Sequence, residues 1–330
     1  MKQQTITFTN SLPERILRHS SLILFVAVLL IFSLLSPKFL TLSNLTNILI
    51  QSSSLTILAV GMTFVLLTAG IDLSVGSIMF VTGVVSGKLV LGGLSIWPGI
   101  LVALIIGLIF GLINAFFVYR LKIIPFIVTL ATFYAGRGLG LLISDTRAIN
   151  LPESFVQIGS SRLLFIPVPV LIMFLVLALA YFTLSSTPFG RQVYAVGNNL
   201  QKARKAGIKV DSILLRVYLI SGVCAAIAGI VALAQLGAVS PTFGYQNEFM
   251  AIAAAVLGGT SLFGGKGNIP GTLLGALLIQ SIQNGLVIVN ADPYFYPVIT
   301  SLVIFLIVMI DSLRHKRELK EMRTKITIDP

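Results

Sequence analysis

Long apolar segments follow one another along almost the whole chain, and this succession constrains the fold more than any other feature. Hydrophobic residues make up 56% of the sequence and charged residues only 10%, far from the composition of a soluble globular domain. In a bilayer every backbone polar group needs a partner within the protein, so such segments form helices. The sequence therefore predicts an all-α polytopic membrane protein.

Segment lengths predict about ten transmembrane helices, although several fall short of the ~20 residues that a full crossing needs. The second segment begins with the polar residues Asn47 and Gln51, and the eighth is rich in glycine and alanine. Either of these two could be a broken or re-entrant segment. The predicted segments are 20–36, 45–69, 74–92, 95–118, 123–144, 167–184, 212–236, 245–262, 269–289 and 295–311.

The distribution of cations indicates which ends face the cytoplasm, because short loops on that side carry most of the Lys and Arg residues. With the N-terminus inside and ten crossings, both termini are cytoplasmic, and so are 18 of the 23 Lys and Arg residues. The chain divides into a cytoplasmic tail at 1–19, a membrane domain at 20–311 and a basic cytoplasmic tail at 312–330. The remaining cations fall in outer loops or within segments: Lys38, Arg147 and Arg162 outside, and Lys88 and Arg137 within.

The residue inventory argues against several other classes of protein. The net charge of +12 comes from cations between apolar segments and not from a basic soluble domain, so nucleic acid binding is rejected. Cys224 is the only cysteine, which rules out a disulfide or a cysteine-rich metal site within one chain. His19 and His315 lie in the tails, so no histidine cluster for a metal is expected.

Two further classes depend on where the acids lie. An ion-coupled secondary transporter would need buried carboxylates, yet Asp72, Glu248, Asp292 and Asp311 are all predicted near segment ends, which disfavours this class. A membrane enzyme would need catalytic groups within a segment, and the sequence offers no histidine, paired carboxylates or activated cysteine there. A purely structural scaffold is compatible with the sequence.

The stretch 59–83 carries one acidic residue, Asp72, between two apolar runs. Gly70 is suited to the positive φ that ends a helix, and Asp72 or Ser74 is suited to capping the next one. We interpret the stretch as a break between two helices, with Gly70, Asp72, Ser74 and Gly76 as candidate signature or gate residues. The charge distribution places this break at the cytoplasmic side, where the simplest role of Asp72 is a helix cap.

The longest predicted cytoplasmic loop, 185–211, is interrupted by Gly190, Gly197 and Gly207. Asn198 or Asn199 is suited to cap a short helix at 200–206. Such a helix, lying outside the membrane, would suit docking to a soluble partner. The alternative is a solvated basic loop attracted to anionic lipid. The basic face of the helix would carry Lys202, Arg204 and Lys205.

A second glycine-rich stretch, 258–271, is not a phosphate-binding loop. Thr260 stands where a Walker A motif has its first glycine, and Gly267 stands where it has Ser or Thr. Since no Walker A motif occurs elsewhere, the chain does not itself hydrolyse nucleotide by P-loop chemistry. We expect the glycines to form a tight turn in which backbones approach closely.

The fourth and ninth segments share a pattern that is compatible with an internal repeat. An offset of five crossings inverts the orientation, as in transporters built from inverted repeats. The same glycine spacing is also a common packing device in any membrane bundle. The matching residues are Gly107, Gly111 and Asn114 in one segment, and Gly271, Gly275 and Asn284 in the other.

Four motifs together resemble the ribose-type permeases, which are membrane subunits of bacterial ABC importers for monosaccharides. The motifs are GMTFVLLTAGIDLSVGS at 61–77, FGRQVYAVGNN at 189–199, AGIKV at 206–210 and AIAAAVLGGTSLFGGKGNIPGTLLGALL at 251–278. The resemblance extends from about residue 35 to 311, and branched-chain amino acid permeases are more distant relatives.

The resemblance implies a non-enzymatic, pore-forming subunit in the bacterial inner membrane, paired with a second permease copy in a homo- or heterodimer. It implies a cytoplasmic ABC ATPase that carries ATP and Mg, a periplasmic sugar-binding protein, and no cofactor on this chain. The loop at 190–208 matches the family's coupling segment. The candidate ATPase-coupling residues are Gly190, Gly197, Asn198, Asn199, Ala203, Arg204 and Gly207.

A sugar pathway needs hydrogen-bonding groups and apolar faces. Arg137 is a strong candidate, because a cation within a segment costs ~2.5 to 3.5 kcal/mol on insertion scales and should face the pore, a carboxylate or a subunit contact. Each amide could instead form an interhelical hydrogen bond. Another small polar solute is the alternative to a sugar. The pathway candidates are Asn114, Phe126, Thr129, Phe133, Tyr134, Arg137, Gln235, Gln280, Gln283 and Asn284.

Overall fold

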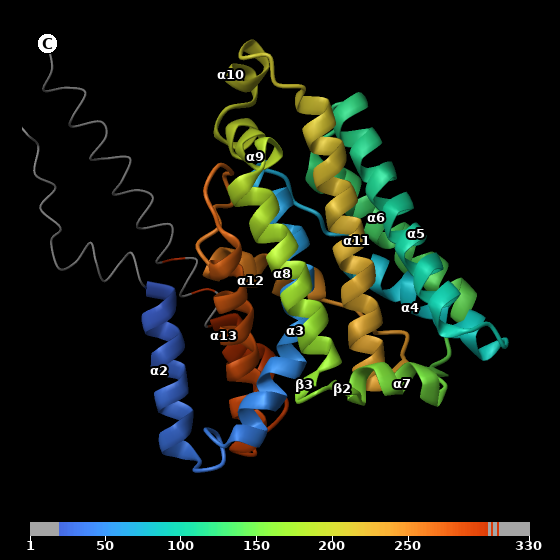
Figure 1. Ribbon diagram of the computed structural model, residues 1–330, viewed down its shortest axis with the longest axis vertical. Coiled ribbons are helices and arrows are strands. Elements are labelled where there is room, and N and C mark those ends of the chain that lie inside the picture. Colours follow the sequence, from blue (N-terminus) through green and yellow to red (C-terminus); the bar gives the residue numbers. More distant parts are fainter. Residues whose placement is uncertain (1–19, 303–304, 306–308, 310–330) are drawn as a thin grey trace, which may run out of the picture.

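The computed structural model describes residues 20–302, 305 and 309, which form a bundle of helices with four two-residue strands (Figure 1). The tails predicted at 1–19 and 312–330 lie outside the described residues. The helices are α2 (Ser20–Leu35), α3 (Leu42–Leu67), α4 (Val75–Leu91), α5 (Ile96–Ala115) with the π-helix η1 (Phe116–Arg120), α6 (Pro125–Ser144), α7 (Glu153–Ser160), α8 (Val168–Ser186), α9 (Pro188–Asn198), α10 (Leu200–Lys205), α11 (Val210–Leu236), α12 (Asn247–Leu257) and α13 (Ile269–Ile288).

Six of the described helices are long and apolar enough to cross a membrane: α3, α5 with η1, α6, α8, α11 and α13. Helices α2, α4 and α12 are apolar but shorter. Residues 295–302 are also helical, and the rest of the predicted tenth segment, apart from 305 and 309, lies outside the described residues. The prediction of a helical membrane protein is confirmed, and each of the first nine predicted segments corresponds to a helix.

The second predicted segment is one continuous helix. Helix α3 runs for 26 residues, about 39 Å at 1.5 Å per residue. Its three consecutive serines do not interrupt it, because Ser52 and Ser53 return their hydroxyls to carbonyls of the preceding turn and Ser54 donates to Ala228 of α11. The second segment is therefore neither broken nor re-entrant.

The eighth predicted segment, 245–262, is much longer than the helix found. Helix α12 has 11 residues, about 16 Å, and cannot cross the ~30 Å hydrocarbon core. Gln246 before it and Gly259 after it both have positive φ, at 66° and 89°, so the backbone turns at each end. Helix α12 is thus a half-length helix buried among α3, α4 and α13.

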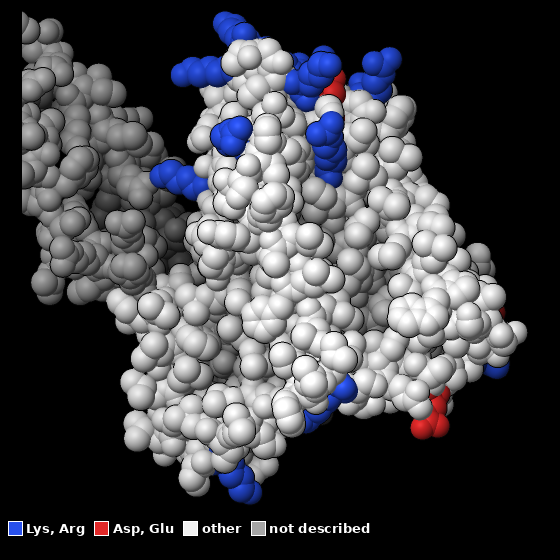
Figure 2. All heavy atoms as spheres, in the orientation of Figure 1, with Lys and Arg blue, Asp and Glu red and all other residues white. Residues whose placement is uncertain are grey.

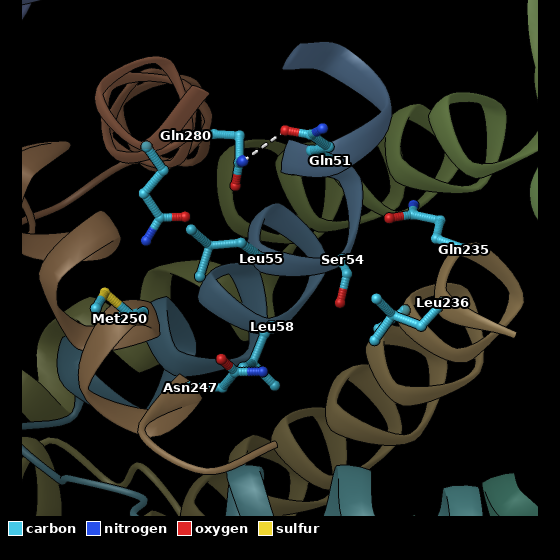
Figure 3. Close-up of a pocket in the computed structure, with 11 residues that line it drawn as sticks. Gln51, Ser54, Leu55, Leu58, Gln235, Leu236, Asn247, Met250 and Gln280 are labelled. Atoms are coloured by element: carbon cyan, nitrogen blue, oxygen red, sulfur yellow. Dashed lines mark hydrogen bonds between the residues drawn. The ribbon is translucent and has the colours of Figure 1, made fainter. Parts of the chain in front are cut away.

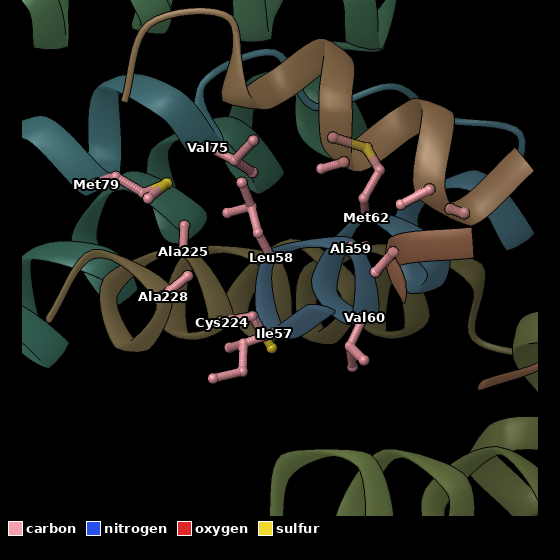
Figure 4. Close-up of a cluster of buried hydrophobic side chains, with 14 of the residues drawn as sticks. Ile57, Leu58, Ala59, Val60, Met62, Val75, Met79, Cys224, Ala225 and Ala228 are labelled. Atoms are coloured by element: carbon pink, nitrogen blue, oxygen red, sulfur yellow. The ribbon is translucent and has the colours of Figure 1, made fainter. Parts of the chain in front are cut away.

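Helices α3 and α11 form the centre of the bundle (Figure 4). Figure 4 shows Ile57, Leu58 and Ala59 of α3 beside Cys224 and Ala225 of α11, and all five side chains are buried. Burying apolar side chains between helices gains little over leaving them in lipid, so close packing of the helix backbones has to stabilise the centre of the bundle.

Small residues provide that close packing. A Cβ atom at Gly107 of α5 would overlap the Gly222 carbonyl oxygen of α11, and one at Gly111 would lie 2.5 Å from the Tyr218 carbonyl oxygen. Helix α5 therefore lies directly against α11, with its last turns beside the first turns of α11. The predicted packing role of these glycines is confirmed.

The two ends of the bundle differ in charge. Cations gather at the end that carries α10, upper in Figures 1 and 2, which we call the α10 end. The opposite α7 end holds α7 and two strand pairs: β1 (Ile149–Asn150) with β4 (Ala238–Val239), and β2 (Arg162–Leu163) with β3 (Ile166–Pro167). Lys88, predicted within a segment, lies at this end, where its half-exposed ammonium pairs with Asp145 at 3.4 Å.

Candidate functional site

Helix α9 covers the α10 end of the bundle. Thr187 caps its start by accepting a 3.2 Å hydrogen bond from the amide of Gly190. Val193 is fully buried, and the Tyr194 hydroxyl donates a 2.8 Å hydrogen bond to the Gly267 carbonyl. Burial raises the pKa of Tyr194, so its hydroxyl keeps the proton that it donates. The helix is therefore fixed to the glycine-rich turn before α13.

Two glycines of α9 make this contact possible. Gly190 and Gly197 lie inside the helix, so the prediction that they interrupt a loop is wrong. A Cβ atom at Gly197 would overlap the Leu67 carbonyl oxygen, and one at Gly190 would overlap carbonyls at the end of α8. The amide of Gly265 donates a 3.0 Å hydrogen bond to the same Leu67 carbonyl. We call this meeting point of Leu67, Gly197 and Gly265 the Leu67 junction.

Helix α10 follows as a short exposed helix, as predicted. Of the two candidate caps, Asn199 fills the role, since its Oδ1 accepts a 2.8 Å hydrogen bond from the Lys202 amide. Gly207 ends the turn with φ of 82° and has open space around it. Ala203 is buried, whereas Arg204 is exposed and pairs with Asp211 at 3.1 Å.

Asn198 is the last residue of α9, and its side chain lies against Gly265, where a Cβ atom would overlap the amide oxygen. The candidate coupling residues thus fall into two groups. Gly190, Gly197 and Asn198 pack against the membrane helices, while Asn199, Ala203, Arg204 and Gly207 shape and flank α10.

The break between α3 and α4 lies just beyond the Leu67 junction. Ala69, and not Gly70, takes the left-handed conformation, with φ of 59°. Gly70 is needed for another reason, since a Cβ atom there would lie 3.0 Å from the Tyr218 hydroxyl and 3.1 Å from Val65. Ser74 is the N-cap residue of α4, although its side chain makes no capping bond, and Asp72 fixes Ser74: its Oδ1 accepts hydrogen bonds from the Ser74 amide at 3.0 Å and the Ser74 hydroxyl at 2.6 Å.

Asp72 lies deeper in the bundle than predicted. Its Oδ2 accepts a 2.7 Å hydrogen bond from Ser221, which stands 11 residues into α11, about 17 Å from the start of that helix. The segment 70–74 turns back into the bundle after Ala69, which carries the carboxylate inward. Asp72 and Glu248 do lie beside helix ends, as predicted, but both carboxylates are buried, because these helix ends lie inside the bundle.

A hydrogen-bond network extends from Asp72 to two more helices. The Asn114 amide donates a 2.8 Å hydrogen bond to the Ser74 hydroxyl and accepts one of 2.7 Å from Thr132. Thr129 donates to the Ile71 carbonyl at 3.1 Å. Asn114 and Thr129, two of the pathway candidates, hold α5 and α6 against the break.

A cavity of about 190 Å³ opens among α3, α11, α12 and α13 (Figure 3). Its polar lining consists of neutral side chains, and a 2.9 Å hydrogen bond joins Gln280 to Gln51. Apolar residues complete the wall. The lining residues are Gln51, Ser54, Leu55, Leu58, Ala232, Gln235, Leu236, Asn247, Met250, Gln280 and Gln283. Neutral amides and a hydroxyl beside apolar surface suit an uncharged, hydroxyl-rich solute.

Three of the predicted pathway residues, Gln235, Gln280 and Gln283, line this cavity. Gln51, Ser54 and Asn247 were missed. The spacing of Gln51, Ser54, Leu55 and Leu58 along α3 places all four on one helix face, which is the signal that could have identified this wall.

The remaining pathway candidates lie elsewhere. Asn284 is buried and accepts a 2.9 Å hydrogen bond from Asn44, so it joins α13 to α3. Phe133 is buried against Tyr134, whereas Phe126 is half-exposed on α6. Arg137 donates to two backbone carbonyls.

Comparison with known proteins shows similarity over nearly the whole chain. Residues 44–313 match the family described as the branched-chain amino acid transport system permease component. The chain is 39% identical over 317 residues to the ribose import permease protein RbsC of Haemophilus influenzae, covering 94% of this chain and 98% of that protein. It is 38% identical to the D-allose transport system permease protein AlsC of Escherichia coli, covering 91% and 93% of the two chains.

A third relative is the autoinducer 2 import system permease protein LsrC of Photorhabdus laumondii, which is 38% identical over 87% of each chain. No solved structure matches the chain. Permease components of ABC transporters are multi-pass membrane subunits without catalytic activity. The family match and the near full-length similarity show that this chain belongs to the family of branched-chain amino acid transport system permease components, within its branch of ABC importers for carbohydrate-like solutes.

Proposed function

We propose that the chain is the membrane pathway of an importer for a monosaccharide of the ribose, galactose or xylose kind. The observation that carries this proposal is the cavity among α3, α11, α12 and α13, whose polar wall is made of neutral amides. Sugar hydroxyls both donate and accept hydrogen bonds, and glutamine and asparagine side chains do the same. The 39% identity to a ribose import permease over 94% of the chain supports the same solute class.

The chain supplies geometry, and the energy comes from a separate ATPase that binds ATP and Mg. A periplasmic binding protein delivers the sugar, and a second permease copy completes the pore as a homo- or heterodimer. No cofactor is proposed on this chain.

The α10 end is proposed to face the cytoplasm, with both termini on that side and ten crossings in the bacterial inner membrane. The gathering of cations at that end supports this orientation (Figure 2). The helices then also fit an inverted repeat of five segments. Helix α5 packs on α4 and α11, and its counterpart α13 packs on α12 and α3.

The ATPase is proposed to dock on α9 and α10. Its movement would reach α3 and the Asp72 break through the Leu67 junction, where three backbones meet without intervening side chains. Asp72 then organises the inner part of the pathway, chiefly through its bonds to Ser74 at the start of α4 and to Ser221 of α11.

Uptake of radiolabelled ribose tests the proposal in cells that carry the chain with its partner subunits. Uptake should vanish when the ATPase is removed and should persist when the proton gradient is collapsed. Gradient-driven uptake by this chain alone would overturn the proposal.

A second solute class is favoured by one observation, the 38% identity to an autoinducer 2 import permease. Competition distinguishes the two. If the solute is a monosaccharide, excess unlabelled D-ribose or D-allose should reduce the uptake of labelled ribose. If the cells instead take up autoinducer 2 and excess ribose does not reduce that uptake, the solute is autoinducer 2 and not a monosaccharide.

A further inference from the structure

Arg137 of α6 is bonded to the stretch of chain that leads into α12. Its two terminal nitrogens donate hydrogen bonds of 2.6 Å to the carbonyls of Phe243 and Pro241. The guanidinium also lies 4.4 Å from the centre of the Phe80 ring of α4. One side chain therefore joins α4 and α6 to the segment 237–246.

Glu248 is the acid on the other side of this segment. Only 3% of the residue is exposed, and its Oε2 has no hydrogen-bond partner within the described chain. It lies in the first turn of α12 and against Gly76, the second residue of α4, where a Cβ atom would overlap Oε2. The N-terminal turns of two helices thus face one carboxylate, and such turns stabilise negative charge.

The two charged groups attract each other without direct contact. Both groups lie against the same face of α4, Arg137 over Phe80 and Glu248 against Gly76, which are four residues and so about one helical turn apart. Among the described residues, however, the direct ion pairs are Lys88 with Asp145 and Arg204 with Asp211. Two opposite charges that are close but not in contact attract each other more strongly in a poorly screened interior than in water.

The residues next to Glu248 line the cavity. Asn247 precedes it, Met250 follows two positions later, and both contribute to the wall. We propose that Arg137 and Glu248 form an electrostatic clasp that holds the segment 237–246 and the start of α12 in place, and so positions Asn247 and Met250 for the solute. The clasp is a property of the fold, and only its effect on transport rests on the proposed function.

Packing alone would give a different result from a clasp. Buried charges are expensive, and replacing both by neutral groups of similar shape often leaves stability unchanged. If Arg137 and Glu248 merely filled space, Glu248→Gln would be silent, because it keeps the shape and removes only the charge. If the clasp acts, Glu248→Gln loosens the segment while the bundle stays folded.

Cysteine labelling measures the segment directly. Ser240 is replaced by Cys in a Cys224→Ala background, which contains no other cysteine. Labelling by a membrane-impermeant maleimide should become about tenfold faster with Glu248→Gln and with Arg137→Gln, since each removes one of the two charges of the clasp. Lys88→Gln is the matched control, because its exposed ion pair with Asp145 should contribute little.

Two further variants test the pairing. Arg137→Lys should label at an intermediate rate, because an ammonium keeps the charge but cannot bond both carbonyls in the same way. Glu248→Gln combined with Arg137→Gln should label no faster than Arg137→Gln alone, because both act on one interaction. Labelling in Glu248→Gln equal to that of the Lys88→Gln control would overturn the clasp, even if Arg137→Gln fails to fold.

Transport is read separately in the same variants. In the clasp variants the sugar concentration for half-maximal uptake should rise about tenfold, since the cavity wall is no longer held. Charge-dependent labelling without any ribose uptake by the parent chain would sink the proposed function and leave the clasp standing. If the labelling rate is the same in the charge variants and the control while ribose uptake is normal, the clasp is overturned and the proposed function stands.

Discussion

Ser221 of α11 donates a 2.7 Å hydrogen bond to the carboxylate of Asp72, and so joins the centre of one long helix to the break that follows another. Ser221→Ala removes this bond and leaves Oδ2 of a buried carboxylate without that donor. We expect a loss of about 1 to 3 kcal/mol in stability. Thermal unfolding in detergent measures it. Ser185→Ala is the control, because Ser185 is exposed and bonds within its own helix. Equal melting temperatures would contradict the link.

Asp72→Asn separates the hydrogen bond to Ser74 from the carboxylate charge. The Asn Oδ1 can still accept the Ser74 amide, so we expect assembly and most of the ribose uptake to be retained. Asp72→Ala removes the bonds to Ser74 and Ser221 and should reduce both. Lost uptake by Asp72→Asn with normal assembly would show that transport needs the carboxylate charge itself.

Gly197→Val should break the Leu67 junction. Even the first side-chain carbon would overlap the Leu67 carbonyl, so α9 must shift away from α3. We expect the ATPase to co-purify poorly and ribose uptake to fall to background. Gly138→Ala on α6 is the control, since its site has open space. A variant that binds the ATPase and transports normally would exclude the junction from coupling.

Substitution of Gly207 tests the turn between α10 and α11 through backbone conformation alone, because there is open space around this residue. Gly207→Val forces a β-branched residue to φ of 82° and should cost about 1 to 3 kcal/mol locally, tilting α10 and weakening ATPase binding. Gly207→Asn should restore much of the binding, because Asn tolerates positive φ. Equal ATPase pull-down with Val and Asn would show that this turn does not position the docking helix.

The amide pair of the cavity provides a test of solute recognition. Gln51→Leu or Gln280→Leu leaves the partner amide unpaired and removes a group suited to sugar hydroxyls. We expect ribose uptake to fall by about tenfold, because the sugar loses one hydrogen-bonding partner in the cavity. Thr46→Val on the same helix is the control, since Thr46 bonds only to its own helix. Unchanged uptake in both Gln variants would remove this cavity from the pathway.

Much of this arrangement could be predicted from the sequence because it depends on local patterns. Apolar length predicted a helix for each of the first nine segments. Asn199 and the basic residues after it predicted α10, and the glycines at 107 and 111 predicted close packing. Each of these features arises within a few residues along the chain.

The errors concern features that arise between distant residues. Nothing near Asp72 indicates that the chain turns inward to reach Ser221, 149 positions later. Nor do the neighbours of Asn114 and Thr129 in the sequence indicate their bonds to Ser74 and Ile71. The glycines of α9 were assigned to a loop because the sequence does not show the carbonyl oxygens of α8 and α3 against which they pack.

Helix α3 passes the cavity at Gln51 and reaches the Leu67 junction 16 residues later, about 24 Å away, as one uninterrupted helix. A continuous helix is stiff along its axis. A displacement of α3 at the junction is therefore transmitted along the helix to the cavity, because no interruption of the helix lies between them. The same stiffness works in the opposite direction, so a solute that shifts Gln51 also presses on the surface beneath α9.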